Sequence, residues 1–320
     1  MVMPRVVHTA QALVDIVAEV PHLPNRGDNV NAATVNRYAG GAVTILLAAA
    51  RLGANCAHAG AIGSGPNGDL IRQVLAAEGI DYGDDPVGGK DTGECFVMVE
   101  PSAERTFVTT YGAERDISAA SLSRTTVQPA DFVCVSGYSL YDPTKDPLLS
   151  YLEQLPSKAR VVLDPGAPFA GFAPELRERM CAMTSVWTSN ADEARDFSGA
   201  DDLSRAMVAI ADRLPDDAVV VVRDGEAGCQ VLVDGEIVDC PGYPRTPVDT
   251  NGAGDTHTGA MLGLVARGMS WVDAAQSANG AGAIKVTRRG PSSAPNLAEV
   301  GGFLAQEGEE SLAAKVAALG

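Results

Sequence analysis

The stretch Pro-Val-Asp-Thr-Asn-Gly-Ala-Gly-Asp-Thr-His-Thr-Gly, residues 247–259, decides how the rest of the sequence is interpreted. It precedes an apolar segment, residues 260–266, that is followed by Gly268, and it therefore predicts a loop leading into a helix N-terminus. Gly252, Ala253 and Gly254 let the backbone approach a ligand closely and leave N–H groups unpaired at the positive end of the helix dipole. The stretch therefore predicts an anion-binding site.

Asp255 follows these three donors directly. A carboxylate there would repel a bound phosphate, so a more useful role is to accept a proton from a substrate hydroxyl. The backbone N–H groups would then stabilise the charge on a transferring phosphoryl group. The pattern predicts Asp255 as a catalytic base, with Gly252, Ala253 and Gly254 as the anion hole. The alternative is an ordinary glycine turn, with Asp255 as a first-turn acid favoured by the dipole alone.

Residues 249–256, Asp-Thr-Asn-Gly-Ala-Gly-Asp-Thr, closely resemble the D-T-x-G-A-G-D-[TS] signature of the ribokinase-like, or PfkB, carbohydrate kinases. This resemblance implies an α/β fold whose central, mostly parallel sheet is flanked by helices on both faces. It also implies a small β-sheet lid, built from segments at about 16–38 and 92–113 within one domain, 1–320. The implied activity is transfer of the γ-phosphoryl group of ATP, with Mg²⁺, to a hydroxymethyl group of a sugar or related polyol.

The composition indicates which partners to expect. A formal charge of −17 opposes binding to nucleic acid and to anionic membranes, because both need basic patches. The six cysteines are widely spaced without a C-x-x-C pair, which favours free thiols in a reducing cytoplasm. No run approaches the roughly 20 apolar residues of a membrane span. We therefore expect a cytoplasmic protein that binds a small molecule.

Hydrophobic patterning supports the implied fold. From residue 130 onward, short apolar strands alternate with helices, as in a parallel sheet covered on both faces. Residues 5–20 read as one long first strand. Residues 29–38 and the hairpin 95–111 contain few large apolar residues and suit a small separate sheet. In the family that sheet closes over the sugar and expels water before transfer, and its uncovered edge predicts a homodimer.

Four positions are implied to bind the acceptor. Asp15 corresponds to an aspartate that grips sugar hydroxyls in the family, although an exposed strand acid is the alternative. Gly40 and Gly41 resemble the family's first glycine motif, and a tight helix entry is the alternative. Asp249 would also contact the acceptor.

The sequence departs from the family pattern on this acceptor side. Thr44 and Ile45 stand where the family has an asparagine after the glycines. Leu13 stands where ribokinases have a second asparagine, two residues before the aspartate. We therefore keep Thr44 as a candidate acceptor contact and expect ribose to be a poor substrate.

The nucleotide side is implied by three further motifs. Asn190 and Glu193 match an N-x-x-E motif near magnesium and the ATP phosphates, and they also read as a helix capping box; both interpretations can hold. Gly225 and Gly228 resemble a G-x-x-G turn beside the nucleotide. Arg223 precedes this turn where threonine is commoner, so contacts to phosphate are expected to differ here.

The segment 278–290 resembles the A-N-A-A-A-A…V-T-R-x-G run of ribokinases. The resemblance implies that Asn279 lines the nucleotide pocket. It also implies a monovalent cation, potassium, held by the loop at Asp249 and Asn251 together with residues 286–293.

Three rival interpretations remain open at this point. Residues 63–68 spell G-x-G-x-x-G, which could indicate a dinucleotide site of a hydride-transferring enzyme. That fold needs an acid at the end of the next strand, and Asp81, Asp84 and Asp85 come before that strand. The other two rivals are a nucleoside kinase of the same fold and a non-catalytic sugar or nucleotide sensor.

Overall fold

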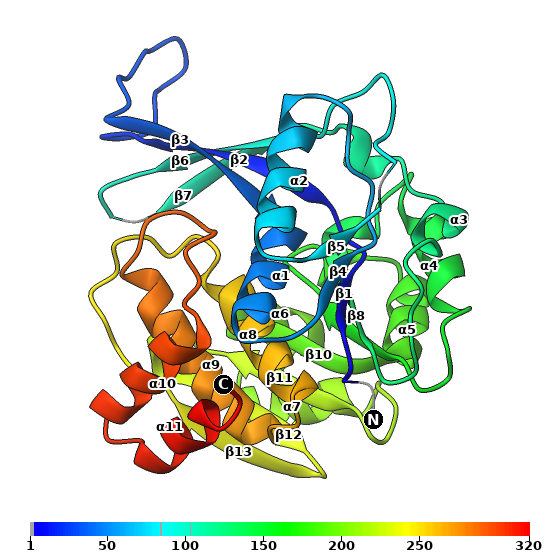
Figure 1. Ribbon diagram of the computed structural model, residues 1–320, viewed down its shortest axis with the longest axis vertical. Coiled ribbons are helices and arrows are strands. Elements are labelled where there is room, and N and C mark those ends of the chain that lie inside the picture. The colour runs from blue at the N-terminus through cyan, green and yellow to red at the C-terminus, as the bar shows by residue number, and fades with distance from the viewer. Residues whose placement is uncertain (1–2, 84, 103) are drawn as a thin grey trace.

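A computed structural model describes residues 3–83, 85–102 and 104–320 (Figure 1). Its larger sheet has the strand order β13-β12-β11-β10-β9-β8-β1-β4-β5. The strands from β11 to β5 in this order are parallel, and β12 and β13 add an antiparallel edge. Their bounds are β1 Val6–His8, β4 Cys56–His58, β5 Asp81–Tyr82, β8 Phe132–Ser136, β9 Arg160–Asp164, β10 Thr184–Asn190, β11 Val219–Arg223, β12 Gly228–Val233 and β13 Glu236–Pro241.

Alternating side chains of these strands enter two hydrophobic cores, one on each face of the sheet. In β11, Val219 and Val221 join one core, whereas Val220 and Val222 join the other. The first core also holds α1 Ala42–Arg51, α2 Pro66–Ala77, α8 Ala253–Ala266, α9 Trp271–Val286, α10 Leu297–Gln306 and α11 Glu310–Ala317. The second holds α3 Ala119–Leu122, α4 Lys145–Leu152, α5 Pro174–Met183, α6 Ala191–Ser198 and α7 Leu203–Ala211. The predicted fold class is confirmed.

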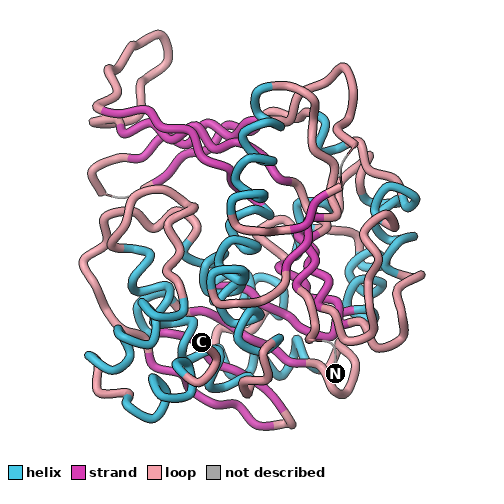
Figure 2. Tube along the Cα trace, in the orientation of Figure 1, coloured by secondary structure: helices cyan, strands magenta, loops and turns pink. Residues whose placement is uncertain are grey.

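The smaller sheet stands off the main body, in the order β3-β2-β6-β7 (Figures 1 and 2). Its strands are β2 Ala12–Glu19, β3 Thr34–Gly41, β6 Glu94–Val99 and β7 Arg105–Thr109. A small core around Val17, Cys95 and Val97 holds it together. We call this sheet the lid. Its first hairpin, β2 and β3, runs from Ala12 to Gly41 and is therefore longer than the expected segment 16–38.

The prediction of one strand over residues 5–20 is wrong, because β1 belongs to the main sheet and β2 to the lid. Between them, the N–H and hydroxyl of Thr9 both donate to the Cys134 carbonyl in the middle of β8, at 3.1 and 2.9 Å. The Gln11 carbonyl then accepts from the N–H of Ala42 at 3.0 Å. These long-range hydrogen bonds redirect the chain from the main sheet towards the lid. The alternation of apolar residues continues across this turn, so the sequence pattern does not reveal it.

In the G-x-G-x-x-G stretch, backbone N–H groups that could bind a phosphate are already hydrogen-bonded to a carboxylate of the protein. Asp91 accepts hydrogen bonds from the backbone N–H groups of Asn67 and Gly68, both at 3.0 Å, at the start of α2. A pyrophosphate would need those same donors, so this stretch is not a dinucleotide site. Over the part of the chain that is described, no helix has the length and apolar character needed to cross a membrane.

Candidate active site

The glycine loop forms the N-terminus of α8, as the sequence predicts. Gly252 is the N-cap residue with φ +75°, a left-handed conformation that favours glycine. The N–H of Ala253 donates to the Thr250 carbonyl at 3.2 Å. Among the described residues, the N–H groups of Gly252 and Gly254 have no such partner. The available donors of the anion hole are therefore those two, and Ala253 shapes the turn.

Asp255 lies in the first turn of α8 and lines a cavity of about 680 Å³. Burial raises its pKa to about 6; the negative charge of Asp164 acts in the same direction, and Arg223 opposes it. A carboxylate poised near neutral pH can take a proton from an alcohol during the reaction. An acid that only interacts with the helix dipole would not need to line a cavity beside free backbone donors. The position of Asp255 therefore favours the role of a base.

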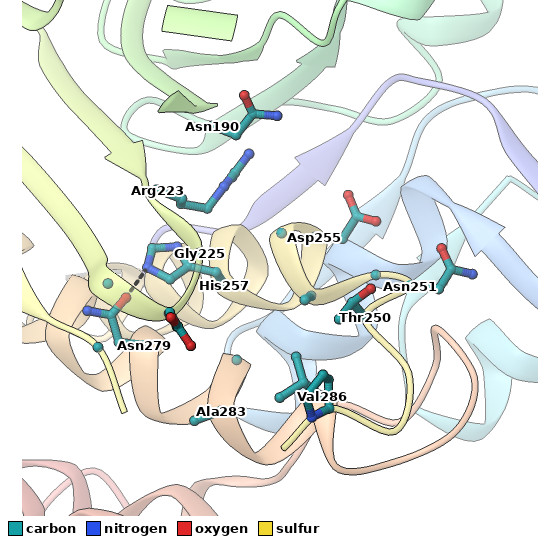
Figure 3. Close-up of a pocket in the computed structure, with 18 of the residues that line it drawn as sticks. Asn190, Arg223, Gly225, Thr250, Asn251, Asp255, His257, Asn279, Ala283 and Val286 are labelled. Carbon is teal, nitrogen blue, oxygen red and sulfur yellow. Dashed lines mark hydrogen bonds between the residues drawn. The ribbon is translucent and has the colours of Figure 1, made fainter. Parts of the chain in front are cut away.

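Arg223 brings a positive charge to the same loop. It ends β11, and its Nη1 donates to the hydroxyls of Thr188 at 2.9 Å and Thr258 at 2.6 Å. Its Nη2 lies 3.5 Å from Asp164. A Cβ added to Gly254 would lie 3.6 Å from the guanidinium group. Figure 3 shows Arg223 and Asn190 on one side of the cavity and Asp255 and Asn251 on another.

Asn190 and Glu193 form the capping box that begins α6. The Asn190 side chain accepts from the Glu193 N–H at 2.8 Å, and Glu193 accepts from the Asn190 N–H at 2.9 Å. Both residues also line the cavity, so capping does not remove them from the site. Burial, followed by repulsion from Asp164, raises the pKa of Glu193.

The oxygen-bearing side chains of the cavity suit a magnesium ion that is bound mainly by the phosphates of a nucleotide. The carboxylates of Asp164, Glu193 and Asp255 all line the cavity. No group of three or more potential ligands within the described ranges is arranged to hold a metal ion by itself. Mg²⁺ usually keeps water and substrate phosphates as ligands, with only one or two carboxylates. The residues therefore fit an ion that arrives with a nucleotide phosphate.

The far end of the cavity is lined by small residues of α9 and by the turn after β11. Asn279 donates to the Cys240 carbonyl at 2.8 Å, and its Oδ1 lies 3.1 Å from Nε2 of His257 (Figure 3). Gly225, Gly228, Gly282 and Ala283 line the same cavity. Such small residues leave room for a flat ring.

Asp15 lies on the lid side of Asp255 and is buried, with 9% of its surface exposed. The alternative of an exposed strand acid is therefore excluded. Burial raises its pKa to about 7, and the charge of Asp255 adds to the effect. A Cβ at Gly40 would lie 2.5 Å from the Asp15 carboxylate, so any larger residue there would force the carboxylate to move.

Two further polar groups lie near this acceptor side. The hydroxyl of Thr44 is buried and has no hydrogen-bond partner among the described residues. The side-chain nitrogen of Asn251 is also buried and faces the Asp15 carboxylate, whose pKa it lowers. Thr44 is close to Gly252, since its Cγ2 would lie 3.1 Å from a Cβ there. A buried polar group without a partner costs about 1–3 kcal/mol, and a hydroxyl group of a ligand would satisfy Thr44.

The carboxylate of Asp249 is used within the protein. One oxygen accepts from the N–H of Asn251 and the other from the N–H of Gly290, both at 2.8 Å. It thereby joins the glycine loop to the segment after α9. Asp15, Gly40, Gly41, Thr44 and Asp249 do not line the 680 Å³ cavity itself. Gly41 has φ +60° and lies at the turn into α1, where an added Cβ would lie 2.5 Å from the Gln11 carbonyl oxygen.

Replacing Gly40 with alanine is expected to push the Asp15 carboxylate out of place. A hydrogen bond to a charged group contributes about 1.5–3 kcal/mol, so kcat/KM for the acceptor should fall roughly 10- to 150-fold. The KM for ATP should change little. Steady-state kinetics of Gly40→Ala, with Gly302→Ala in an open position of α10 as the control, check this. An unchanged kcat/KM for the acceptor would remove Asp15 from the site.

Asp164 and Lys285 were not predicted from the sequence, although both lie at the site. Asp164 ends β9 and faces Arg223; an acid directly after an apolar strand was the available signal, because ligands bind at the C-terminal ends of parallel strands. Lys285 is fully buried near the end of α9. Burial lowers its pKa to about 8, and the Asp249 carboxylate opposes that shift.

An anion hole, a buried carboxylate and a cationic guanidinium group facing one cavity beneath a lid define a site of the phosphoryl-transfer class. The family model described as "pfkB family carbohydrate kinase" matches residues 3–297. The chain belongs to the pfkB family of carbohydrate kinases, phosphotransferases with an alcohol group as acceptor.

Individual relatives agree with this assignment. The uncharacterised sugar kinase YegV of Escherichia coli is 30% identical over 292 residues, covering 90% of each chain. Ribokinase of Haemophilus influenzae is 29% identical over 296 residues, covering 91% of this chain and 95% of its own. A double mutant of Vibrio cholerae fructokinase, solved with fructose, ADP and a potassium ion, superposes with a TM-score of 0.78 at 24% identity, covering 94% and 98% of the two chains.

Proposed function

We propose that this kinase transfers the γ-phosphoryl group of ATP to a hydroxymethyl group of a sugar or nucleoside, with Asp255 as the base. The acceptor hydroxyl gives its proton to the Asp255 carboxylate. Its oxygen forms a bond to the γ-phosphorus while the bond to the β–γ bridging oxygen breaks, and ADP leaves. The observation that carries the proposal is the position of Asp255, whose pKa is raised, directly after the free N–H groups of a turn that lies against Arg223.

The remaining residues divide between the two substrates. Asp15, Asn251 and Thr44 hold the acceptor on the lid side, and Asp249 keeps the loop in position. The nucleotide side consists of residues that line the cavity, namely Asn190, Glu193, Arg223, Gly225, Gly228 and Asn279. Magnesium, when bound, would neutralise charge on the phosphates, with Asp164 and Glu193 nearest to hold it through water.

Ribose is expected to be a poor acceptor. Leu13 and Ile45 stand where ribokinases have amide side chains, so ribose hydroxyls facing them would lose water without gaining partners. Two such losses would lower kcat/KM by on the order of 10²–10⁴ relative to a fitting acceptor. An ADP-release assay across ribose, fructose, other ketoses and common nucleosides tests this and the proposed function together.

Each outcome of that assay has a distinct meaning. Acceptor-stimulated ADP release that is strongest with a hexose or a nucleoside supports the proposal. Ribose giving the highest kcat/KM of the panel would overturn the acceptor assignment alone. Tight ATP binding without acceptor-stimulated release across the whole panel would favour the non-catalytic sensor.

We also propose a cytoplasmic homodimer. All six cysteines are buried free thiols, which suits a reducing compartment. The lid exposes several large apolar side chains, which a second subunit could cover; these are Val35, Phe96, Phe107 and Val108.

A further inference from the structure

Lys285 is a buried cation at the point where two segments of the active site meet. None of its surface is exposed. Its Nζ donates to the Asp249 carbonyl at 2.9 Å and lies 3.5 Å from the Arg288 carbonyl. These carbonyls belong to the two segments, 249–251 and 286–293, between which the ribokinase resemblance implies a potassium ion.

A fully buried lysine is rare because removing an ammonium group from water is costly unless it is paired. Here the Asp249 carboxylate provides the opposite charge, and the backbone carbonyls accept the N–H groups. The same Asp249 carboxylate holds the N–H groups of Asn251 and Gly290. The lysine therefore belongs to the cluster that fixes the glycine loop.

The charge of Lys285 also reaches the reacting groups. Burial raises the pKa of Asp255, and the positive charge of Lys285 acts in the opposite direction and lowers that pKa. A positive charge at this point stabilises an ionised base and an anion on the loop, which is the electrostatic task of a cation beside an anion hole.

We propose that the ammonium group of Lys285 takes the place of the monovalent cation, so that this kinase works without potassium. The proposal rests on the proposed function, since it concerns the same loop. The ammonium group of Lys285 supplies one positive charge that is covalently attached to the chain. It also occupies the carbonyl oxygens of Asp249 and Arg288, which a bound ion would need. The chain's residues thus do not fit a free potassium ion, in contrast to the fructokinase solved with one.

The simplest alternative is that Lys285 only ties α9 to the glycine loop. A structural tie would stabilise the fold but would create no site that a small cation could fill after the lysine is removed. Rescue by an ion therefore separates the two roles.

The first experiment uses the wild-type protein in KCl, NaCl and tetramethylammonium chloride at one ionic strength. The turnover with the best acceptor should agree within about twofold, because screening is then the same in each salt. The melting temperature should show no potassium-specific increase, and crystals soaked in rubidium should show no anomalous scatterer at the loop. Roughly tenfold or greater activation by potassium, or a rubidium ion bound between Asp249 and Arg288, would overturn the proposal.

The second experiment uses Lys285→Ala, which removes the ammonium group and leaves space. Its kcat in tetramethylammonium should fall roughly 10- to 100-fold, the effect of losing one stabilising group at an anion hole. Potassium or ammonium should restore part of it and should raise the melting temperature of this variant only. Lys285→Met fills the space without the charge and should lose activity without rescue.

Lys315→Ala is the matched control, because Lys315 is an exposed lysine paired with Asp273 at 2.7 Å; it should behave as wild type in every salt. If no small cation rescues Lys285→Ala, Lys285 is a structural tie and the proposal fails. If Lys285→Ala does not fold, the wild-type salt series and rubidium soak still decide. A wild-type protein that phosphorylates nothing would contradict the proposed function, while the melting and rubidium measurements would still test Lys285.

Discussion

Asp255→Asn is expected to lower kcat by roughly 10²–10⁴, the usual contribution of a positioned general base. Asparagine keeps the size and polarity of the side chain but cannot accept the proton of the acceptor hydroxyl. The backbone donors of Gly252 and Gly254 and the guanidinium of Arg223 stay in place. The affinity for ATP should therefore change little.

Turnover with the best acceptor and ATP affinity by titration calorimetry are the two measurements for this variant. Asp201→Asn, an exposed acid before α7, provides the matched control and should keep full activity. If Asp255→Asn kept turnover near that of wild type, the assignment of the base would be wrong.

Arg223→Met is expected to lower kcat by roughly 10²–10³, as the loss of one group that stabilises transition-state charge does. Methionine fills similar space without the positive charge beside Gly254. Because Arg223 lowers the pKa of Asp255, its removal should raise that pKa. The base would then be protonated at higher pH, and the acid limb of the pH–rate profile should move upward.

Steady-state kinetics over pH 5–8 measure both effects of Arg223→Met. Arg195→Met, on the exposed side of α6, is the matched control and should leave the profile unchanged. A kcat within about threefold of wild type, far smaller than the expected loss, would place Arg223 outside the reaction.

Local sequence predicted the parts of this protein that depend on local physics. Gly252 and Gly254 signal a tight turn at a helix N-terminus, and Asp255 follows them directly. The strands after residue 130 follow from runs such as 219–222, whose apolar side chains enter both cores. Asn190 and Glu193 were recognisable because a capping box has fixed spacing.

The remaining features depend on contacts between distant parts of the chain. The turn at Thr9 is made by the Cys134 carbonyl, 125 residues away, so the continuous apolar pattern concealed it. The burial of Asp15 depends on the glycine at position 40 of the neighbouring strand. Lys285 is a single residue without a local pattern, and its partner, the Asp249 carbonyl, is 36 residues away.

The central claim is that Asp255 activates a hydroxymethyl group for attack on the γ-phosphorus of ATP. Phosphorus–proton correlation NMR of the product, made with the acceptor of highest kcat/KM, tests it most directly. The account predicts a new phosphomonoester coupled to two methylene protons, formed in equal amount to ADP, and formed roughly 10²–10⁴ times more slowly with Asp255→Asn. Inorganic phosphate as the only new phosphorus species, or a phosphoester coupled to a single ring proton, would contradict it.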